Sequence, residues 1–194
     1  MNELPHILQL DAAGNPHKWI TYEKAAYYYT KNLIAWSMQA TDFVLHGGIS
    51  SMTGEQSTLT IDTIIAIKGK ISGKQLAHIN RVPLTNRTLF GRDRNVCAYC
   101  GGSFSHHDLS RDHIIPTSKG GPNIWMNVVT ACHSCNKHKD DRTPEQAGMQ
   151  LLYVPYIPNK AEYLILKNHR ILADQMQFLL ARVSDDSRLR QLSA

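Results

Sequence analysis

Residues 97–136, CAYCGGSFSHHDLSRDHIIPTSKGGPNIWMNVVTACHSCN, decide the fold of this chain because they hold all four of its cysteines. The cysteines form two pairs with the same internal spacing, Cys97 with Cys100 and Cys132 with Cys135. Four thiolates in two such pairs supply the tetrahedral ligand set of a structural zinc site. Two disulfides or four buried thiols are the alternatives. The pairs are separated by 31 residues, more than the usual spacing of about 15–20, so we expect inserted structure between them.

The composition is that of a folded protein. Of the 194 residues, 42% are hydrophobic and 19% are charged, which is enough apolar character to form a core. No apolar run approaches about eighteen residues, and the N-terminus lacks the basic and apolar regions of a signal peptide. We therefore expect no membrane span, no secretion signal and a cytoplasmic location, where disulfides are disfavoured.

Positive charge is concentrated in one part of the chain. Residues 1–80 hold equal numbers of basic and acidic residues and no arginine, whereas residues 81–142 hold nine basic and five acidic residues. A basic segment of this kind favours a polyanionic partner, most often one that carries phosphate. The change in composition predicts an N-terminal accessory region over 1–80, a central domain over 81–148 and a C-terminal helical extension over 149–194.

The flanking regions show their own helix and strand patterns. Thr21 is expected to cap a helix whose apolar stripe extends to Trp36. The β-branched residues of 57–68 predict a strand. A short helix is expected over 145–152, and a longer one over 161–183, where apolar residues recur at helical spacing.

Polar residues between and after the cysteine pairs suit the hydrolysis of a phosphodiester bond. A strand through Asp112 and a helix after the second pair would form a compact ββα unit, in which Asp112 and Asn136 approach each other on one face. A neutral imidazole at His113 is a suitable general base near pH 7, oriented by Asn127 or by a nearby carbonyl. The oxygens of Asp112 and Asn136 are hard ligands that suit magnesium.

Cationic residues of the same segment are candidates for contacts with a nucleic-acid backbone. These are Arg111, Lys119, Lys137, Lys139 and Arg142. Each polar residue of the segment also has an ordinary structural interpretation, as a hydrogen-bonded pair, a turn residue, a helix cap or a solvated face. Their joint occurrence within one zinc-binding unit favours the catalytic interpretation.

Residues 92–148, which include SRDHIIPTSKGGPNIWMNVVTACHSCNKHKDD, resemble the HNH endonucleases of the ββα-metal fold, in the branch with four zinc cysteines. The flanking segments resemble a bacterial subgroup of such proteins. With these flanks we expect an α+β protein: a zinc-stabilised ββα-metal (HNH) nuclease domain, an N-terminal α/β accessory region and a C-terminal helix.

The resemblance implies a role for each matching residue. The four cysteines match the structural zinc ligands, and His113 matches the general base that activates water. Asp112 matches the acidic ligand of the catalytic divalent ion, and Asn127 matches the asparagine that holds the loop and orients the base. Asn136 stands where the last histidine of the motif is usually found. Family members with asparagine there use its amide oxygen for the metal.

We therefore expect a DNA endonuclease with a structural Zn²⁺ and a catalytic Mg²⁺ or Mn²⁺. The main alternative is a non-catalytic zinc module that binds nucleic acid, in which Asp112 and His113 are structural. A toxin nuclease, whose N-terminal half engages an immunity or delivery partner, is a third interpretation without a visible delivery segment. DNA is the expected partner, RNA and a homodimer stay open, and no membrane partner is expected.

Overall fold

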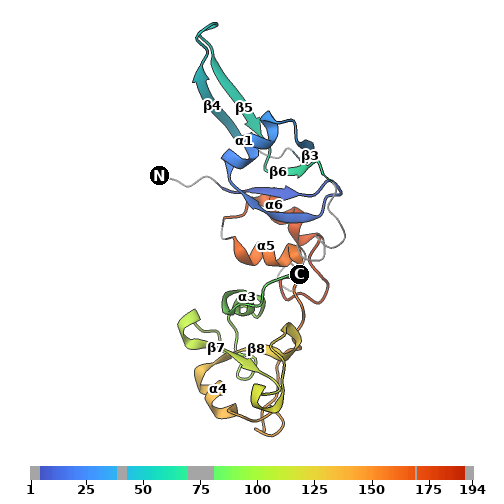
Figure 1. Cartoon of the computed structure of the whole chain (residues 1–194). Coiled ribbons are helices and arrows are strands. Elements are labelled where there is room, and N and C mark those ends of the chain that lie inside the picture. The colour runs from blue at the N-terminus through green and yellow to red at the C-terminus, as the bar shows by residue number, and fades with distance from the viewer. Residues whose placement is uncertain (1–4, 39–42, 70–80, 169, 191–194) are drawn as a thin grey trace. The chain divides into compact units, whose positions relative to one another are not determined.

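The computed structural model describes residues 5–38, 43–69, 81–168 and 170–190, which belong to two compact units (Figure 1). The first unit comprises Met1–Arg81 and Asn168–Arg182, and the second comprises Val82–Lys167 and Val183–Ala194. Both units combine helices with strands, in agreement with the expected α+β class. None of the described helices is long and apolar enough to cross a membrane.

The first unit is built on a four-stranded sheet with the strand order β2-β1-β6-β3. Its strands are β1 (Ile7–Leu10), β2 (Pro16–Ile20), β3 (Ile34–Met38) and β6 (Ile64–Ile67). β1 pairs in parallel with β6, and the other two pairings are antiparallel. Helix α1 (Tyr22–Thr30) contributes Tyr22 and Ala25 to the core beside the sheet.

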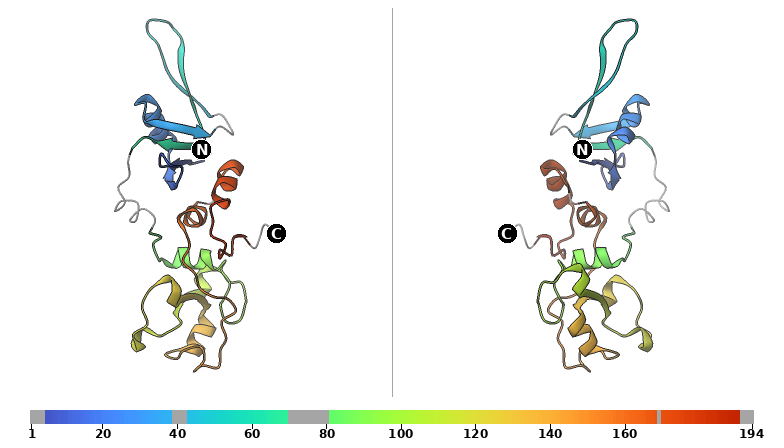
Figure 2. Two further views of the ribbon diagram at one scale, coloured as in Figure 1. Left: turned by 90° about the vertical axis from the view of Figure 1, so that its right-hand side faces the viewer. Right: turned by 90° about the vertical axis from the view of Figure 1, so that its left-hand side faces the viewer.

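Two further elements complete the first unit. Strands β4 (Phe43–Ile49) and β5 (Gln56–Ile61) form an antiparallel hairpin that extends away from the four-stranded sheet (Figure 1 and Figure 2). Helix α6 (Ala173–Leu180) is joined to the sheet region by the buried Gln175, whose Nε2 donates to the carbonyl oxygens of His6 and Thr63, both at 2.9 Å.

The second unit holds the two cysteine pairs. Strands β7 (Leu109–His113) and β8 (Val128–Cys132) are antiparallel, with His113 opposite Val128. Helices α3 (Asn86–Arg92) and α4 (His133–Lys139) both contact these strands, and α5 (Lys160–Lys167) contacts α3. The unit also contains short 3-10 turns at His106–Asp108, Thr117–Lys119 and Trp125–Asn127.

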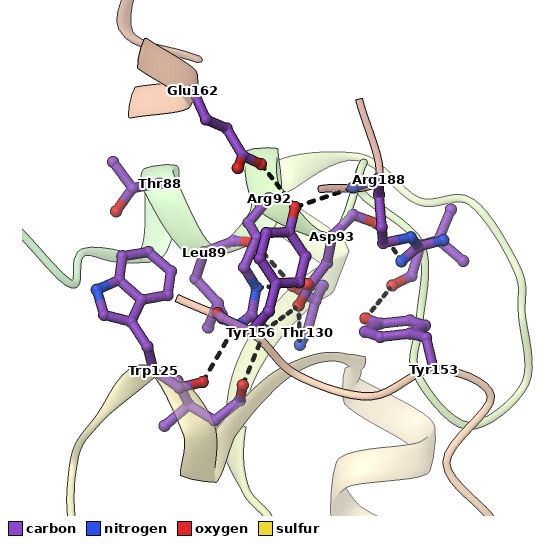
Figure 3. Close-up of polar contacts among 12 residues, drawn as sticks. Thr88, Leu89, Arg92, Asp93, Trp125, Thr130, Tyr153, Tyr156, Glu162 and Arg188 are labelled. Atoms are coloured by element: carbon purple, nitrogen blue, oxygen red, sulfur yellow. Dashed lines mark hydrogen bonds and ion pairs between the residues drawn. The ribbon is translucent and has the colours of Figure 1, made fainter. Parts of the chain in front are cut away.

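A buried arginine of the second unit bonds several segments of the chain (Figure 3). Arg92 is 1% exposed and forms a two-bond ion pair with Asp93, at 2.7 and 3.0 Å. Its guanidinium also donates to the carbonyl oxygens of Trp125, Tyr156 and Val128, each at 2.9 Å. These five hydrogen bonds connect α3, the start of β8 and the segment around Tyr156. We call Arg92 and its four partners the arginine cluster.

The residues after 148 do not form a separate unit. The predicted extension 149–194 contributes residues to both units, because Asn168–Arg182 belongs to the first and the remainder to the second. Within the second unit, Arg188 donates to the carbonyl oxygen of Asp93 at 3.3 Å, and its backbone N–H donates to the Tyr156 hydroxyl at 3.2 Å (Figure 3). The C-terminal segment therefore closes over the arginine cluster.

The expected N-terminal helix is confirmed at its start and wrong at its end. Thr21 caps α1, and its hydroxyl accepts from the backbone N–H of Lys24 at 3.5 Å. The helix ends at Thr30, and Asn32 adopts a left-handed φ of 52°. Trp36, expected on the helix, lies in β3 because the chain there pairs with β6.

Three other element expectations need correction. Residues 57–68 form two strands, β5 and β6, instead of one. Residues 145–152 form turns without a helix, and Gly148 has a left-handed φ of 66°. The helix expected over 161–183 is divided into α5 and α6, with Asn168 accepting from the backbone N–H of Arg170 at 3.1 Å between them.

Candidate active site and zinc centre

The four cysteines lie together, as their spacing predicts. Their Sγ atoms are all within 4.8 Å of one another. Zinc–sulfur bonds of about 2.3 Å in a tetrahedron place the sulfurs about 3.8 Å apart, which lies within that limit. The donor set and its geometry therefore fit a structural zinc ion, and all four positions are filled by protein.

Local backbone geometry forms this cluster. The first pair lies in a turn in which Cys97 N–H donates to the Gly102 carbonyl at 2.9 Å, and Gly101 takes a φ of 73° that favours glycine. In the second pair, Cys132 caps α4, and its Sγ accepts from Cys135 N–H at 3.4 Å. A further bond, from Ala98 N–H to the Thr130 carbonyl at 2.8 Å, holds the first turn against β8.

The thiols differ in how readily they ionise. Burial acts to raise the pKa of Cys97, but hydrogen bonds from the backbone of Cys100, Cys132 and Tyr99 outweigh it and lower that pKa overall. Burial, followed by a hydrogen bond with the neighbouring Cys132, raises the pKa of Cys135. The pKa of Cys97 is thus lowered and that of Cys135 is raised, and the charge of a bound metal ion would favour the thiolate at both.

Strand β7 and helix α4 place Asp112 and Asn136 on a common face. Ser110 and Asp112 are two positions apart on β7, so their side chains leave the same side of the strand. Both meet α4: Asn136 Nδ2 donates to Ser110 Oγ at 2.8 Å, and Lys139 Nζ donates to Asp112 Oδ1 at 2.9 Å. Asp112 and Asn136 therefore lie on the face predicted, although each is bonded to another residue.

The Asp112 carboxylate is bonded through both of its oxygens. Oδ1 accepts from Lys139, and Oδ2 accepts from the hydroxyl of Tyr99, which lies between Cys97 and Cys100. Asp112 is 4% exposed and Lys139 is 1% exposed. Burial and the bond to Asp112 raise the pKa of Tyr99, so it remains a donor. The carboxylate is thus held between the turn that carries Cys97 and Cys100 and helix α4.

His113 leaves the opposite side of β7 from Asp112. Its Nε2 is 3.2 Å from Oδ1 of Asn123, and the same oxygen accepts from Arg111 Nη1 at 3.0 Å. Because an amide oxygen only accepts, the contact requires a proton on Nε2 and leaves the lone pair on Nδ1. Arg111 and Asn123 thus select the tautomer of His113 in which Nδ1 can act as a base.

The Asn127 side chain holds the loop after β7 through hydrogen bonds to Ile115 and Pro122. Its Oδ1 accepts from Ile115 N–H at 3.0 Å, and its Nδ2 donates to the carbonyls of Ile115 and Pro122 at 3.1 and 2.9 Å. The side chain is buried, with 6% exposure. The loop is tight, since a Cβ at Gly121 would lie 1.8 Å from the Ile115 oxygen. Orientation of the histidine falls to Asn123, which the sequence did not single out.

The predicted phosphate contacts differ in their surroundings. Lys137 is exposed and, with Asn136, lines a surface hollow of about 480 Å³. Lys119 is exposed but donates to the Asp141 carbonyl at 2.7 Å and to Gln146 Oε1 at 2.9 Å. Arg142, also exposed, donates to the carbonyls of His138 and Lys139 at the end of α4.

Two of the predicted cationic side chains form hydrogen bonds within the protein. Lys139 is buried against Asp112, and its Nζ also donates to the His113 carbonyl at 2.7 Å. Arg111 is bonded to Asn123, and its Nη2 reaches the Leu84 carbonyl at 3.4 Å. Burial lowers the pKa of Arg111. In this arrangement neither side chain presents its charge freely to a phosphate.

Residues missed by the sequence interpretation include Tyr99, Asn123 and the pair Arg92–Asp93. The buried ion pair holds strand β8 of the candidate site in place, because Asp93 Oδ2 accepts from Thr130 N–H on β8 at 2.8 Å. Arg92 bonds the carbonyls on both sides of Asn127, those of Trp125 and Val128. Lys139 was predicted as a cation, but its pairing with Asp112 was not. A signal for that pairing was available, because a residue three positions after Asn136 on a helix shares a face with it.

Comparisons with known proteins agree with the resemblance seen in the sequence. Residues 97–152 match the HNH endonuclease family model. The chain is also 41% identical over 49 residues to the CRISPR-associated endonuclease Cas9 of Corynebacterium diphtheriae. That match spans 25% of this chain and 4% of the length of the relative. The predicted family is therefore confirmed for the segment that carries both cysteine pairs, β7, β8 and α4: residues 97–152 form an HNH endonuclease domain.

Proposed function

We propose that this chain is a metal-dependent endonuclease that hydrolyses phosphodiester bonds of DNA. One observation carries the proposal. Within the segment that matches the HNH endonuclease family, Asp112 and His113 occupy consecutive positions at the end of β7, beside a four-cysteine cluster. A nucleic-acid substrate follows from the family, and DNA is our choice within that class.

In the proposed reaction, His113 is the general base. Its Nδ1 takes a proton from the attacking water, while Nε2–H stays bonded to Asn123 Oδ1. Arg111 acts as a positioning residue, since its bond to Asn123 keeps the amide oxygen directed at the imidazole. Asn127 holds the loop that carries Asn123. These residues arrange the base without themselves contacting the reacting atoms.

A divalent ion, Mg²⁺ or Mn²⁺, would be held by the oxygens of Asp112 and Asn136. Such an ion, when bound, stabilises negative charge on the phosphate and on the leaving oxygen. Carboxylate and amide oxygens are the donors that this ion prefers, and both residues meet on the face between β7 and α4. The bond from Lys139 to Asp112 competes with this role, and its consequence is developed below.

Backbone contacts with DNA are assigned to the exposed cations near α4. Lys137 lines the hollow beside Asn136, and Lys119 and Arg142 lie in segments joined to the end of the same helix. Contacts of this kind hold the duplex without reading its sequence. An RNA substrate, a homodimer and a cytoplasmic location stay predictions of the sequence.

The test is cleavage of supercoiled plasmid by zinc-loaded protein in magnesium, manganese or EDTA, with His113→Ala beside the wild type. We expect metal-dependent nicking or linearisation, and a loss on the order of two to four decades of rate in the variant. Equal cleavage by both proteins would remove His113 from the mechanism. His46→Ala, which replaces an exposed histidine of β4 outside the candidate site, serves as the matched control for the purification.

A second candidate function is a zinc module that binds nucleic acid without cutting it. The buried ion pair between Asp112 and Lys139 favours this alternative, because it gives Asp112 a purely structural partner. The same plasmid assay separates the two functions. Protein that holds zinc and binds DNA, yet leaves the plasmid intact with every ion, would support the binding module.

A further inference from the structure

The carboxylate that the proposed function assigns to a divalent ion already has a cation beside it. We propose that Lys139 is an internal counter-ion of Asp112 and that a divalent ion binds by displacing its ammonium group. The proposal rests on the proposed function, because it takes Asp112 to be a metal ligand. It changes the role of Lys139 from a fixed phosphate contact to a group that exchanges with the metal.

Burial makes the lysine necessary in the absence of metal. Asp112 is 4% exposed, and a buried carboxylate without a compensating charge would be strongly destabilising. The ammonium of Lys139, itself from a residue only 1% exposed, lies 2.9 Å from Asp112 Oδ1. Its second bond, to the His113 carbonyl at 2.7 Å, leaves it enclosed between α4 and the end of β7.

The two cations cannot share the same oxygen. Magnesium binds carboxylate oxygen at about 2.1 Å, so a metal ion on Oδ1 would lie within a few ångströms of the ammonium and repel it. Lysine has a flexible four-carbon chain and can withdraw its charge. Lys139 is also the last residue of α4, and its chain neighbours His138 and Asp140 are both exposed.

Tyr99 is the partner that stays in place. Its hydroxyl donates to Oδ2, the other oxygen, and its backbone lies in the turn between Cys97 and Cys100. Zinc binding would hold that turn rigid, so Tyr99 keeps the carboxylate oriented while Lys139 leaves. The displaced ammonium then emerges beside the base, where it can contact a phosphate of the substrate.

Lysine acetylation of the zinc-loaded wild-type chain, quantified by mass spectrometry, tests the exchange without any substitution. We expect Lys139 to react slowly in EDTA-free buffer without divalent ion and several-fold faster with saturating Mg²⁺, because the ion exposes its amine. Lys137, exposed on the same helix, is the internal control and should react equally in both conditions. In Asp112→Asn, the effect of Mg²⁺ on Lys139 should disappear.

Mn²⁺ binding, followed by the electron paramagnetic resonance signal of the free ion, gives a second readout. Lys139→Met should bind Mn²⁺ at least about tenfold more tightly than the wild type, since the ion no longer has to displace a buried ammonium. Lys137→Met should bind it like the wild type. Asp112→Asn should lose the site.

The outcomes separate this inference from the proposed function. If Mn²⁺ binds to the wild type through Asp112 while Lys139 labelling stays constant, the exchange is wrong and the metal role stands. If Lys139→Met folds and binds Mn²⁺ no more tightly, the exchange is likewise wrong. If no divalent ion binds at Asp112 in either protein, the metal role in the proposed function falls, and the exchange falls with it.

Discussion

Replacing Asn127 with alanine tests whether this residue holds the loop between the two strands of the site. The buried side chain makes three hydrogen bonds to the backbone of Ile115 and Pro122, at 3.0, 3.1 and 2.9 Å. At about 1 kcal/mol of net stabilisation for each bond, the variant should lose about 3 kcal/mol of unfolding free energy. The matched control is Asn123→Ala, whose exposed amide bonds only side chains, and whose cost should stay below about 1 kcal/mol.

The assay combines chemical denaturation of zinc-loaded protein with hydrogen exchange at the Ile115 amide. That amide donates to Asn127 Oδ1, so it reports the loop directly. A loss of about 3 kcal/mol corresponds to roughly a hundredfold faster exchange if the loop opens. Unchanged exchange at Ile115, with an unfolding free energy within about 0.5 kcal/mol of the wild type, would refute the assignment of Asn127 as the residue that holds the loop.

Three further predictions address the base, the core and the response to pH. Asn123→Ala should remove the preference of His113 for one tautomer. Long-range ¹⁵N NMR should then show a mixture of Nδ1–H and Nε2–H forms, where the wild type shows Nε2–H. An unchanged spectrum would exclude the positioning role of Asn123. Arg92→Met leaves the Asp93 charge buried and removes a donor from three carbonyls, so unfolding free energy should fall by about 3–5 kcal/mol, against little change for the exposed Arg94→Met; equal denaturation midpoints would contradict it. Burial raises the pKa of Glu162 above its ordinary value of 4.5, so its contribution to stability is complete below that pH and is lost as the pH rises toward the higher folded value. Glu162→Gln should therefore gain stability relative to the wild type as the pH is raised from 4 to 7, and parallel stability curves for the two proteins would disprove this.

The zinc centre could be predicted from sequence because its geometry follows from local spacing. Two residues between cysteines fit a tight turn at Cys97–Cys100 and the first turn of α4 at Cys132–Cys135. The family was also recognisable, and it is confirmed over residues 97–152. The roles of Asp112, His113, Asn127 and Asn136 stay predictions, although the structure arranges all four around β7, β8 and α4.

Other features depend on tertiary contacts that no local pattern carries. Trp36 continues an apolar helical stripe in the sequence, yet it lies in a strand. The reason is its pairing with Ala66 of β6, which lies 30 residues further along the chain. Nothing near Arg92 indicates that its guanidinium is buried, since three of its acceptors come from Trp125, Val128 and Tyr156. Asn123 is one of several polar turn residues, and only the fold brings it to His113.

The arginine cluster limits how far this chain can be truncated. The segment that matches the family begins at residue 97 and ends at 152, so it excludes Arg92 and Asp93 on one side and Tyr156, Glu162 and Arg188 on the other. A fragment limited to residues 97–152 would retain every cysteine and every proposed active-site residue. It would lose Arg92 and Asp93, which bond Val128 and Thr130, and so expose that part of β8. We therefore expect the smallest piece able to fold to be larger than the segment that sequence comparison recognises, and to include the C-terminal residues around Arg188.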